Sequence, residues 1–316
     1  MKRKQSGFKI MMRLIKLVKP LAFFMVLAVI LGVTGFLCAI QITVVGSMTL
    51  LTAAGINGGL AIKTGCICII IFAVLRGFLH YGEQACNHYI AFKLLALIRD
   101  KVFKSLRRLT PAKLEGKDKG NLISLITSDI ELLEVFYAHT ISPICIAFLT
   151  SLVMLIFIGR YSIWLMLVAL VAYITVGIII PLVSSKFNKN IGMTYRENSG
   201  SLSGYVLDSM RGLLESIRYN STDTRLNEMN EKTDELNSLQ KKLKKIEGHN
   251  ISITDISIIF FSITMLLVAI CLYQKGTIGF DGLIVSTVAM MSSFGPVAAL
   301  SNLAGNLTHT LASGER

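Results

Sequence analysis

The sequence predicts an all-α membrane protein with six transmembrane helices and two long cytoplasmic helical hairpins. Of its 316 residues, 53% are hydrophobic and 16% are charged, whereas a soluble domain carries about 25% charged residues. The apolar residues gather in six blocks along the chain, and a spanning helix needs about 20 such residues. Two long charged segments, whose apolar residues have helical spacing, lie between these blocks.

The first element is a basic segment, residues 1–20, which precedes the first apolar block. Lys9, Arg13 and Lys16 would share one face of a helix there, with apolar side chains on the opposite face. This pattern predicts an amphipathic elbow helix at the membrane surface, separated from the first span by Pro20. The apolar block that follows is too long for a signal peptide, and no small-residue cleavage site comes after it.

The second span is predicted to continue far beyond the membrane. Helical spacing of apolar residues extends past the second apolar block, and no Gly or Pro interrupts it from Gln84 to Thr110. One helix from Leu60 to Leu109 would be about 75 Å long, which exceeds a hydrocarbon core of about 30 Å. We expect spans at about residues 21–51, 60–86, 136–159, 161–185, 251–273 and 283–306, and hairpins at about 87–135 and 186–250.

Each hairpin contains a predicted turn. In the first hairpin, Pro, Gly and charged residues cluster in TPAKLEGKDKG, residues 110–120, and we expect the return helix to begin near Asn121. In the second hairpin, a charged helix follows the end of the fourth span near Pro181, breaks around Gly212 and returns through residues 226–245. Charged helices of this kind need neighbours to pack against, so the two hairpins are expected to act as rigid levers.

The net charge of +13 is distributed unevenly along the chain. Basic residues crowd the N-terminus and the two hairpins, whereas the expected outer loops hold Lys63, Arg160, Lys275 and Asp281. The positive-inside rule then places both termini and both hairpins in the cytoplasm. Anionic lipid headgroups account for the positive charge, so we expect membrane lipids, and not nucleic acid, as its partner.

The six cysteines all lie in apolar segments, and none forms a CxxC pair. They are expected to be small buried hydrophobic residues and not a disulfide framework. No catalytic residue and no metal site is expected on this chain.

A polar stripe occupies the cytoplasmic half of the second span. Its members recur at helical spacing on two adjacent faces of the helix; they are Arg76, His80, Glu83, Gln84, Asn87 and His88. Ionisable groups inside a membrane are costly and usually face a bundle interior or a water-filled cavity. The stripe therefore either holds the span against neighbouring helices through hydrogen bonds or lines a substrate cavity, where Arg76 would suit an anionic group.

Three local sequences resemble motifs of a known family. LEGKDKGNLISLITSDIELLEVF resembles the first intracellular loop of ABC exporters, and LDSMRGLLESIRYNSTDTRLNEM resembles their second intracellular loop. HTLASGER resembles the exit from their sixth span. The first-loop motif falls on Gly120, Asn121, Leu122, Ser124 and Asp129. The sequence is thus similar to the transmembrane domain of an ABC exporter half-transporter with the type IV fold.

This resemblance implies that both hairpin tips are coupling turns, which nucleotide-binding domains push when they close on ATP. It also implies dimerisation with a second half-transporter. The coupling residues that it implies are Thr110, Pro111, Lys113, Glu115 and Gly120 in the first turn, and Gly212, Glu215, Ile217 and Tyr219 in the second.

A finer resemblance is carried by AVLRGFLHYGEQACNHYIAFKLLALIRDKVFKSL and VFYAHTISPICIAF. Both are similar to the CydC-type subunit of the bacterial cytochrome bd biogenesis exporter. That resemblance implies a cell-membrane location, export of haem or of thiols such as cysteine and glutathione, and a CydD-type heterodimer partner. It also makes His88 a candidate axial haem ligand, and imidazole binds haem iron well. The alternatives are an exporter of lipids, drugs or peptides with the same fold, and a non-transporting regulatory or docking subunit.

No segment matches the phosphate-binding pattern GxxxxGK[ST]. The chain alone is therefore not expected to hydrolyse ATP. We expect ATP and Mg²⁺ to act through a nucleotide-binding domain, either in a continuation of this chain beyond Arg316 or in a separate polypeptide, and we favour the continuation.

Overall fold

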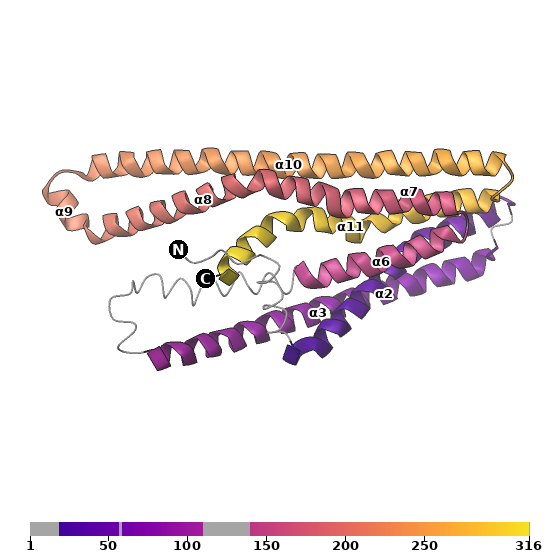
Figure 1. Ribbon diagram of the computed structural model, residues 1–316, viewed down its shortest axis with the longest axis horizontal. Coiled ribbons are helices and arrows are strands. Elements are labelled where there is room, and N and C mark those ends of the chain that lie inside the picture. The colour runs from indigo at the N-terminus through magenta and orange to yellow at the C-terminus, as the bar shows by residue number, and fades with distance from the viewer. Residues whose placement is uncertain (1–18, 57–58, 110–139, 316) are drawn as a thin grey trace. The chain divides into compact units, whose positions relative to one another are not determined.

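The computed structural model describes residues 19–56, 59–109 and 140–315 (Figure 1). Within these residues the chain is helical apart from short connections and contains no strand, which confirms the predicted all-α class. Six of the described helices are long and apolar enough to cross a membrane. The predicted elbow helix up to residue 18, the turn at residues 110–120 and the return helix expected from Asn121 lie outside the described residues.

The chain divides into two compact units. Unit 1 comprises Met1–Pro181 and Thr254–Arg316, and unit 2 comprises Leu182–Ile253. The described elements, many of them labelled in Figure 1, are η1 (Lys19–Leu21), α2 (Ala22–Ala53), α3 (Ile62–Leu109), α6 (Ser142–Gly159), α7 (Ile163–Ile174), η4 (Thr175–Ile179), α8 (Ile180–Arg211), α9 (Leu213–Arg218), α10 (Thr222–Gln274) and α11 (Phe280–Glu315).

Two helices are far longer than a bilayer requires. α3 is unbroken over 48 residues, as the uninterrupted pattern from Leu60 to Leu109 predicts, and α10 is unbroken over 53 residues. At 1.5 Å per residue these helices are about 72 Å and 80 Å long, against about 30 Å for a hydrocarbon core. Each of them must therefore extend well beyond any membrane that it crosses.

The core of unit 1 is built by α2, α6, α7, α10 and α11. Each of these helices contributes a fully buried side chain, respectively Ile40, Ile158, Leu165, Met265 and Met290. α11 is the most enclosed of the six candidate spans, because 56% of its apolar stretch is buried, against 6% for that of α3. α3 therefore lies at the edge of unit 1, where it packs against α2.

Small residues allow α2 and α3 to approach each other closely. Gly35 of α2 faces Leu79 of α3. At Gly65 of α3, an added Cβ would overlap Thr49 Oγ1 of α2 and would lie 3.0 Å from Thr49 Cβ and Cγ2. The contact between the first two spans therefore depends on the absence of a side chain at position 65.

A π-helical turn carries the helical path through Pro181, near which the fourth span is predicted to end. In η4 the Ile180 N–H donates to the carbonyl of Thr175, five residues earlier. Proline has no N–H, and its ring clashes with the carbonyl four residues earlier in an α-helix. The wider turn removes this conflict, so that α8 continues to Arg211.

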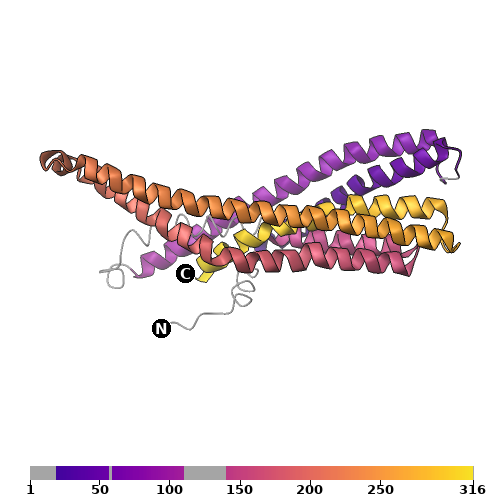
Figure 2. The same ribbon diagram turned by 90° about the horizontal axis from the view of Figure 1, so that it is seen from above.

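Unit 2 is a helical hairpin in which parts of α8 and α10 lie side by side with α9 at the turn (Figures 1 and 2). Polar contacts join the two long helices near the turn. The Tyr205 hydroxyl donates to Glu228 Oε2 at 2.7 Å, and this hydrogen bond raises the pKa of Tyr205. Arg225 Nη1 donates to Ser209 Oγ at 3.2 Å. These contacts fix the register of α8 against α10.

Candidate functional site

Two members of the predicted polar stripe are buried in unit 1. Glu83 is 6% exposed and Asn87 is 4% exposed. The carboxyl carbon of Glu83 would lie 3.3 Å from a Cβ added at Gly32 of α2, and the Ile146 side chain of α6 packs against the same glycine. The Glu83 carboxylate therefore lies where α2, α3 and α6 meet, in space that Gly32 leaves open.

Neighbours on its own helix hold the Glu83 carboxylate. Oε2 lies 3.2 Å from His80 Nδ1, and Oε1 accepts a hydrogen bond from Asn87 Nδ2 at 3.3 Å. Both carboxylate oxygens thus have a partner, as a buried carboxylate requires. The same contact orients the His80 ring, although the His80 side chain is 62% exposed.

The remaining members of the stripe are more accessible. Arg76 and His88 are exposed, like His80, and Gln84 is half-buried. The structure thus separates the stripe into a buried carboxylate and amide and an exposed set with an arginine and two imidazoles. Glu83 and Asn87 make hydrogen bonds inside the bundle, whereas the exposed set faces outward from unit 1.

Three buried polar atoms in this region have no hydrogen-bond partner among the described residues: Asn87 Oδ1, Ser142 Oγ and Thr150 Oγ1. Ser142 and Thr150 each lie one helical turn from Ile146 on the same face of α6. A buried polar atom without a partner costs free energy in apolar surroundings.

His88 is the haem-ligand candidate that the sequence suggests. Its ring stacks on Phe92, with the ring centroids 6.1 Å apart. His80 lies eight residues earlier on the same helix, about 12 Å along its axis, so the two imidazoles cannot bind one iron. Within the described part of the chain, no group of three or more His, Cys, Asp or Glu residues is placed to hold a metal ion. His88 stays a haem-ligand candidate predicted from the sequence.

α9 forms the tip of unit 2 and is fixed by hydrogen bonds around Ser216. This serine is buried; its Oγ donates to the Gly212 carbonyl at 2.9 Å, and its carbonyl accepts from the Ser221 N–H at 2.9 Å. Asn220 adopts a left-handed backbone with φ of 51°, which Asn tolerates better than most residues. The tip is therefore a defined turn between the two long helices.

The side chains that α9 presents outward form a largely apolar surface. We define the α9 surface by five exposed residues, Leu213, Leu214, Glu215, Ile217 and Tyr219, beside which Arg218 of α9 is also exposed. Tyr219 is 82% exposed, and exposed apolar clusters mark interaction sites.

The structure places each predicted residue of the second coupling turn at this tip. Glu215, Ile217 and Tyr219 belong to the α9 surface, and Gly212 precedes it. Leu213 and Leu214 were not among the residues predicted from the sequence, although two adjacent leucines at the tip of a charged hairpin indicate an apolar surface there. The predicted residues of the first turn, from Thr110 to Gly120, lie outside the described residues.

Comparison with known proteins places these features in a family. The family described as the ABC transporter transmembrane region matches residues 21–297. The chain is 44% identical over 313 residues to a "Probable ABC transporter ATP-binding/permease protein" of Haemophilus influenzae, covering 99% of this chain and 57% of that protein.

More distant relatives differ in their named substrates. The chain is 23% identical to the "Glutathione/L-cysteine transport system ATP-binding/permease protein CydC" of Haemophilus influenzae, over 56% of this chain and 31% of that protein. It is 25% identical to the "ATP-dependent lipid A-core flippase" of Shewanella denitrificans, over 58% of this chain and 30% of that protein. The chain thus spans little more than half the length of the first of these relatives and about a third of the other two.

The intracellular-loop motifs predicted an ABC exporter transmembrane domain. The family match and the relative that is 44% identical confirm the ABC transporter family. Six helices long and apolar enough to cross a membrane lie within the described residues, as a transporter's membrane region requires. The chain belongs to the ABC transporter transmembrane region family.

Proposed function

We propose that this chain is the membrane-spanning permease part of an ATP-driven ABC exporter in the cell membrane. The observation that carries the proposal is the α9 surface, which exposes apolar side chains at the tip of a charged hairpin. A nucleotide-binding domain would cover this surface. In this proposal ATP and Mg²⁺ bind to that domain. The relative that is 44% identical supports this, because it is named an ATP-binding/permease protein.

Motion would enter the membrane through α10. This helix begins at Thr222, close to the α9 surface in sequence, and continues unbroken to Gln274. A domain that closes on ATP while docked at the tip would displace the start of α10, and a continuous helix transmits such a displacement along its axis. The positive-inside rule places the tip and both termini in the cytoplasm.

The exposed part of the polar stripe is the proposed substrate-contacting face. Arg76 and His80 offer cationic or hydrogen-bonding groups there, and Arg pairs well with carboxylates. Glu83 and Asn87 act as positioning residues, since Glu83 holds the His80 ring at 3.2 Å. Both roles considered for the stripe, interhelical hydrogen bonding and substrate contact, are thus assigned to different members according to their burial.

The substrate class that we propose is a small thiol with carboxylate groups, such as cysteine or glutathione. We propose that this chain and a CydD-like half-transporter together form the transporter that moves it. The relative named as a glutathione/L-cysteine transport protein supports this class, as does the exposed Arg76. A lipid is the second candidate, supported by the lipid A-core flippase relative. Haem is a further ligand candidate through the exposed His88.

The test is transport by the full-length protein with its partner half-transporter in inside-out proteoliposomes. Labelled glutathione or cysteine is expected to accumulate when ATP and Mg²⁺ are added. Arg76→Gln is expected to lower the initial rate about tenfold, because losing a charge-assisted contact of about 1.4 kcal/mol changes an affinity by that factor. Arg160→Gln is the control, since Arg160 is an exposed arginine in the short α6–α7 connection.

The outcomes separate the candidates. Thiol uptake that needs no ATP would contradict the exporter, and equal rates for Arg76→Gln and Arg160→Gln would remove Arg76 from the substrate path. ATP-driven movement of a lipid and of no thiol would replace the substrate class. In a parallel haem titration, a Soret shift that survives His88→Ala would exclude His88 as a ligand.

A further inference from the structure

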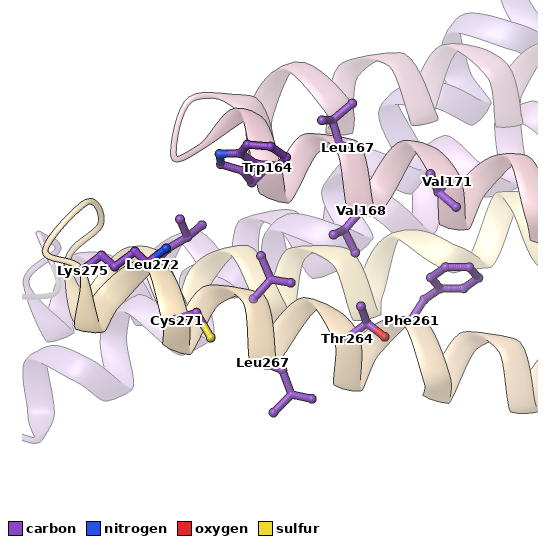
Figure 3. A pocket seen from close by; sticks show the side chains of 11 residues that line it. Trp164, Leu167, Val168, Val171, Phe261, Thr264, Leu267, Cys271, Leu272 and Lys275 are labelled. Carbon is purple, nitrogen blue, oxygen red and sulfur yellow. The ribbon is translucent and has the colours of Figure 1, made fainter.

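A groove in unit 1 lies between α7 and α10, outside the polar stripe and the α9 surface (Figure 3). The volume of the groove is about 560 Å³, within the range of about 300–1,000 Å³ that small-molecule pockets span. Leu167 and Val171 line it from α7, and Leu267 and Val268 line it from α10. Leu267 is 57% exposed, so the groove is open along its side.

The side chains that line the groove favour an apolar ligand. Thr264 lies near the Phe261 end of the lining (Figure 3), and its hydroxyl already donates to the Phe260 carbonyl of its own helix at 2.9 Å. The Thr264 proton is therefore already used, and apart from the weakly polar Cys271 thiol the other side chains between the two ends of the groove are apolar. An alkyl chain would satisfy these walls, whereas a polar ligand would lose its hydration without compensation.

The ammonium and the indole N–H of the lining lie at one end of the groove. Trp164 and Lys275 are at the end next to the short connections, and Val171 and Phe261 are at the other (Figure 3). The Ser162 hydroxyl oxygen caps α7 by accepting a hydrogen bond from the backbone N–H of Trp164 at 3.3 Å. This contact fixes the tryptophan in the first helical turn. Trp and basic residues are typical anchors at the membrane–water interface, so this end of the groove lies at headgroup level.

The length of the groove matches one leaflet. From Phe261 to Lys275, α10 rises about 21 Å, whereas half of a hydrocarbon core is about 15 Å and the headgroup region adds several more ångströms. A single acyl chain that starts at the headgroup level would follow the groove to the middle of the bilayer.

We propose that this groove holds one acyl chain of an anionic phospholipid from the leaflet on the side of the short connections. Its phosphate would pair with the Lys275 ammonium and accept a hydrogen bond from the Trp164 indole N–H. The complementary charge at one end and the apolar walls along the remaining length favour a lipid over a second protein surface. The inference is independent of which substrate the exporter moves.

Native mass spectrometry of the full-length protein tests the proposal, with phosphatidylglycerol or phosphatidylcholine added to the detergent. Wild-type protein is expected to retain phosphatidylglycerol in preference to phosphatidylcholine. Leu267→Trp fills the groove and is expected to abolish the retained lipid, and Lys275→Gln is expected to weaken phosphatidylglycerol binding about tenfold through the loss of one charge-assisted contact.

Matched controls come from the same structure. Ile263→Trp enlarges a similarly exposed residue of α10 that does not line the groove, and Lys63→Gln removes an exposed lysine near the start of α3. Both controls are expected to bind lipid as wild type does. Melting temperatures of the two tryptophan variants that equal the wild-type melting temperature exclude misfolding. The proposal would be overturned if Leu267→Trp retained as much lipid as wild type. It would also be overturned if Leu267→Trp dissociated the transporter assembly while the lipid stayed bound.

Discussion

Replacement of Glu215 and Tyr219 by alanine is expected to lower ATP-driven transport by the full-length protein about tenfold or more. Buried aromatic anchors of an interface contribute about 2 kcal/mol or more when truncated, and about 1.4 kcal/mol corresponds to a factor of ten. Tyr219 is 82% exposed in this chain, so its ring does not support the fold of unit 2. The variant should therefore keep its melting temperature and retain ATP hydrolysis that no longer drives transport.

The control for this experiment is Met193→Ala. Met193 is also an exposed large side chain of unit 2, but it belongs to α8, far in sequence from the tip. Its replacement is expected to leave the ratio of transport to ATP hydrolysis unchanged. If the Glu215 and Tyr219 variant keeps the wild-type ratio, the α9 surface is not the coupling element.

Glu83→Ala is expected to destabilise the protein by about 1–3 kcal/mol, the cost of leaving a buried polar group without its partner. The change removes the acceptor of the Asn87 amide, and Asn87 Oδ1 already has no partner among the described residues. It also opens a space beside Gly32 and Ile146. Thermal unfolding in detergent, followed by intrinsic fluorescence, measures the effect.

Glu83→Gln provides the matched comparison. The glutamine side chain fills the same volume, can accept from Asn87 and can donate to His80, so most of the lost stability should return. A melting temperature for Glu83→Gln as low as that of Glu83→Ala would mean that charge, and not hydrogen bonding, holds this region. Wild-type stability of Glu83→Ala would mean that Glu83 does not lie in the packed junction of α2, α3 and α6.

The long helices were predictable because their signals are local. Apolar periodicity without Gly or Pro from Gln84 to Thr110 is sufficient to specify α3, and the break at Gly212 falls between α8 and α9. The π-helical turn before Pro181 was not predictable in the same way. Proline signals a conflict with helical geometry, but whether the chain kinks, ends or widens there depends on its tertiary packing.

The division of the polar stripe also depends on tertiary packing. Helical spacing places Arg76 and Glu83 on one face of α3, yet Arg76 is exposed and Glu83 is buried. Gly32 makes the difference at the level of Glu83, because it leaves room for the carboxylate between α2 and α6. The groove between α7 and α10 likewise requires that residues about 100 positions apart lie together, which a single sequence does not encode as a local pattern.

The proposed exporter requires that the α3 polar face open to one side of the membrane at a time, and cysteine accessibility in proteoliposomes measures this most directly. His80→Cys would be introduced into a full-length protein whose six native cysteines in this region are replaced, with Ile70→Cys, an exposed apolar position of α3, as the control. A membrane-impermeant maleimide is expected to label His80→Cys from the cytoplasmic side without nucleotide and from the opposite side when ATP and vanadate trap the closed state. Labelling from the same side in both conditions would contradict the account.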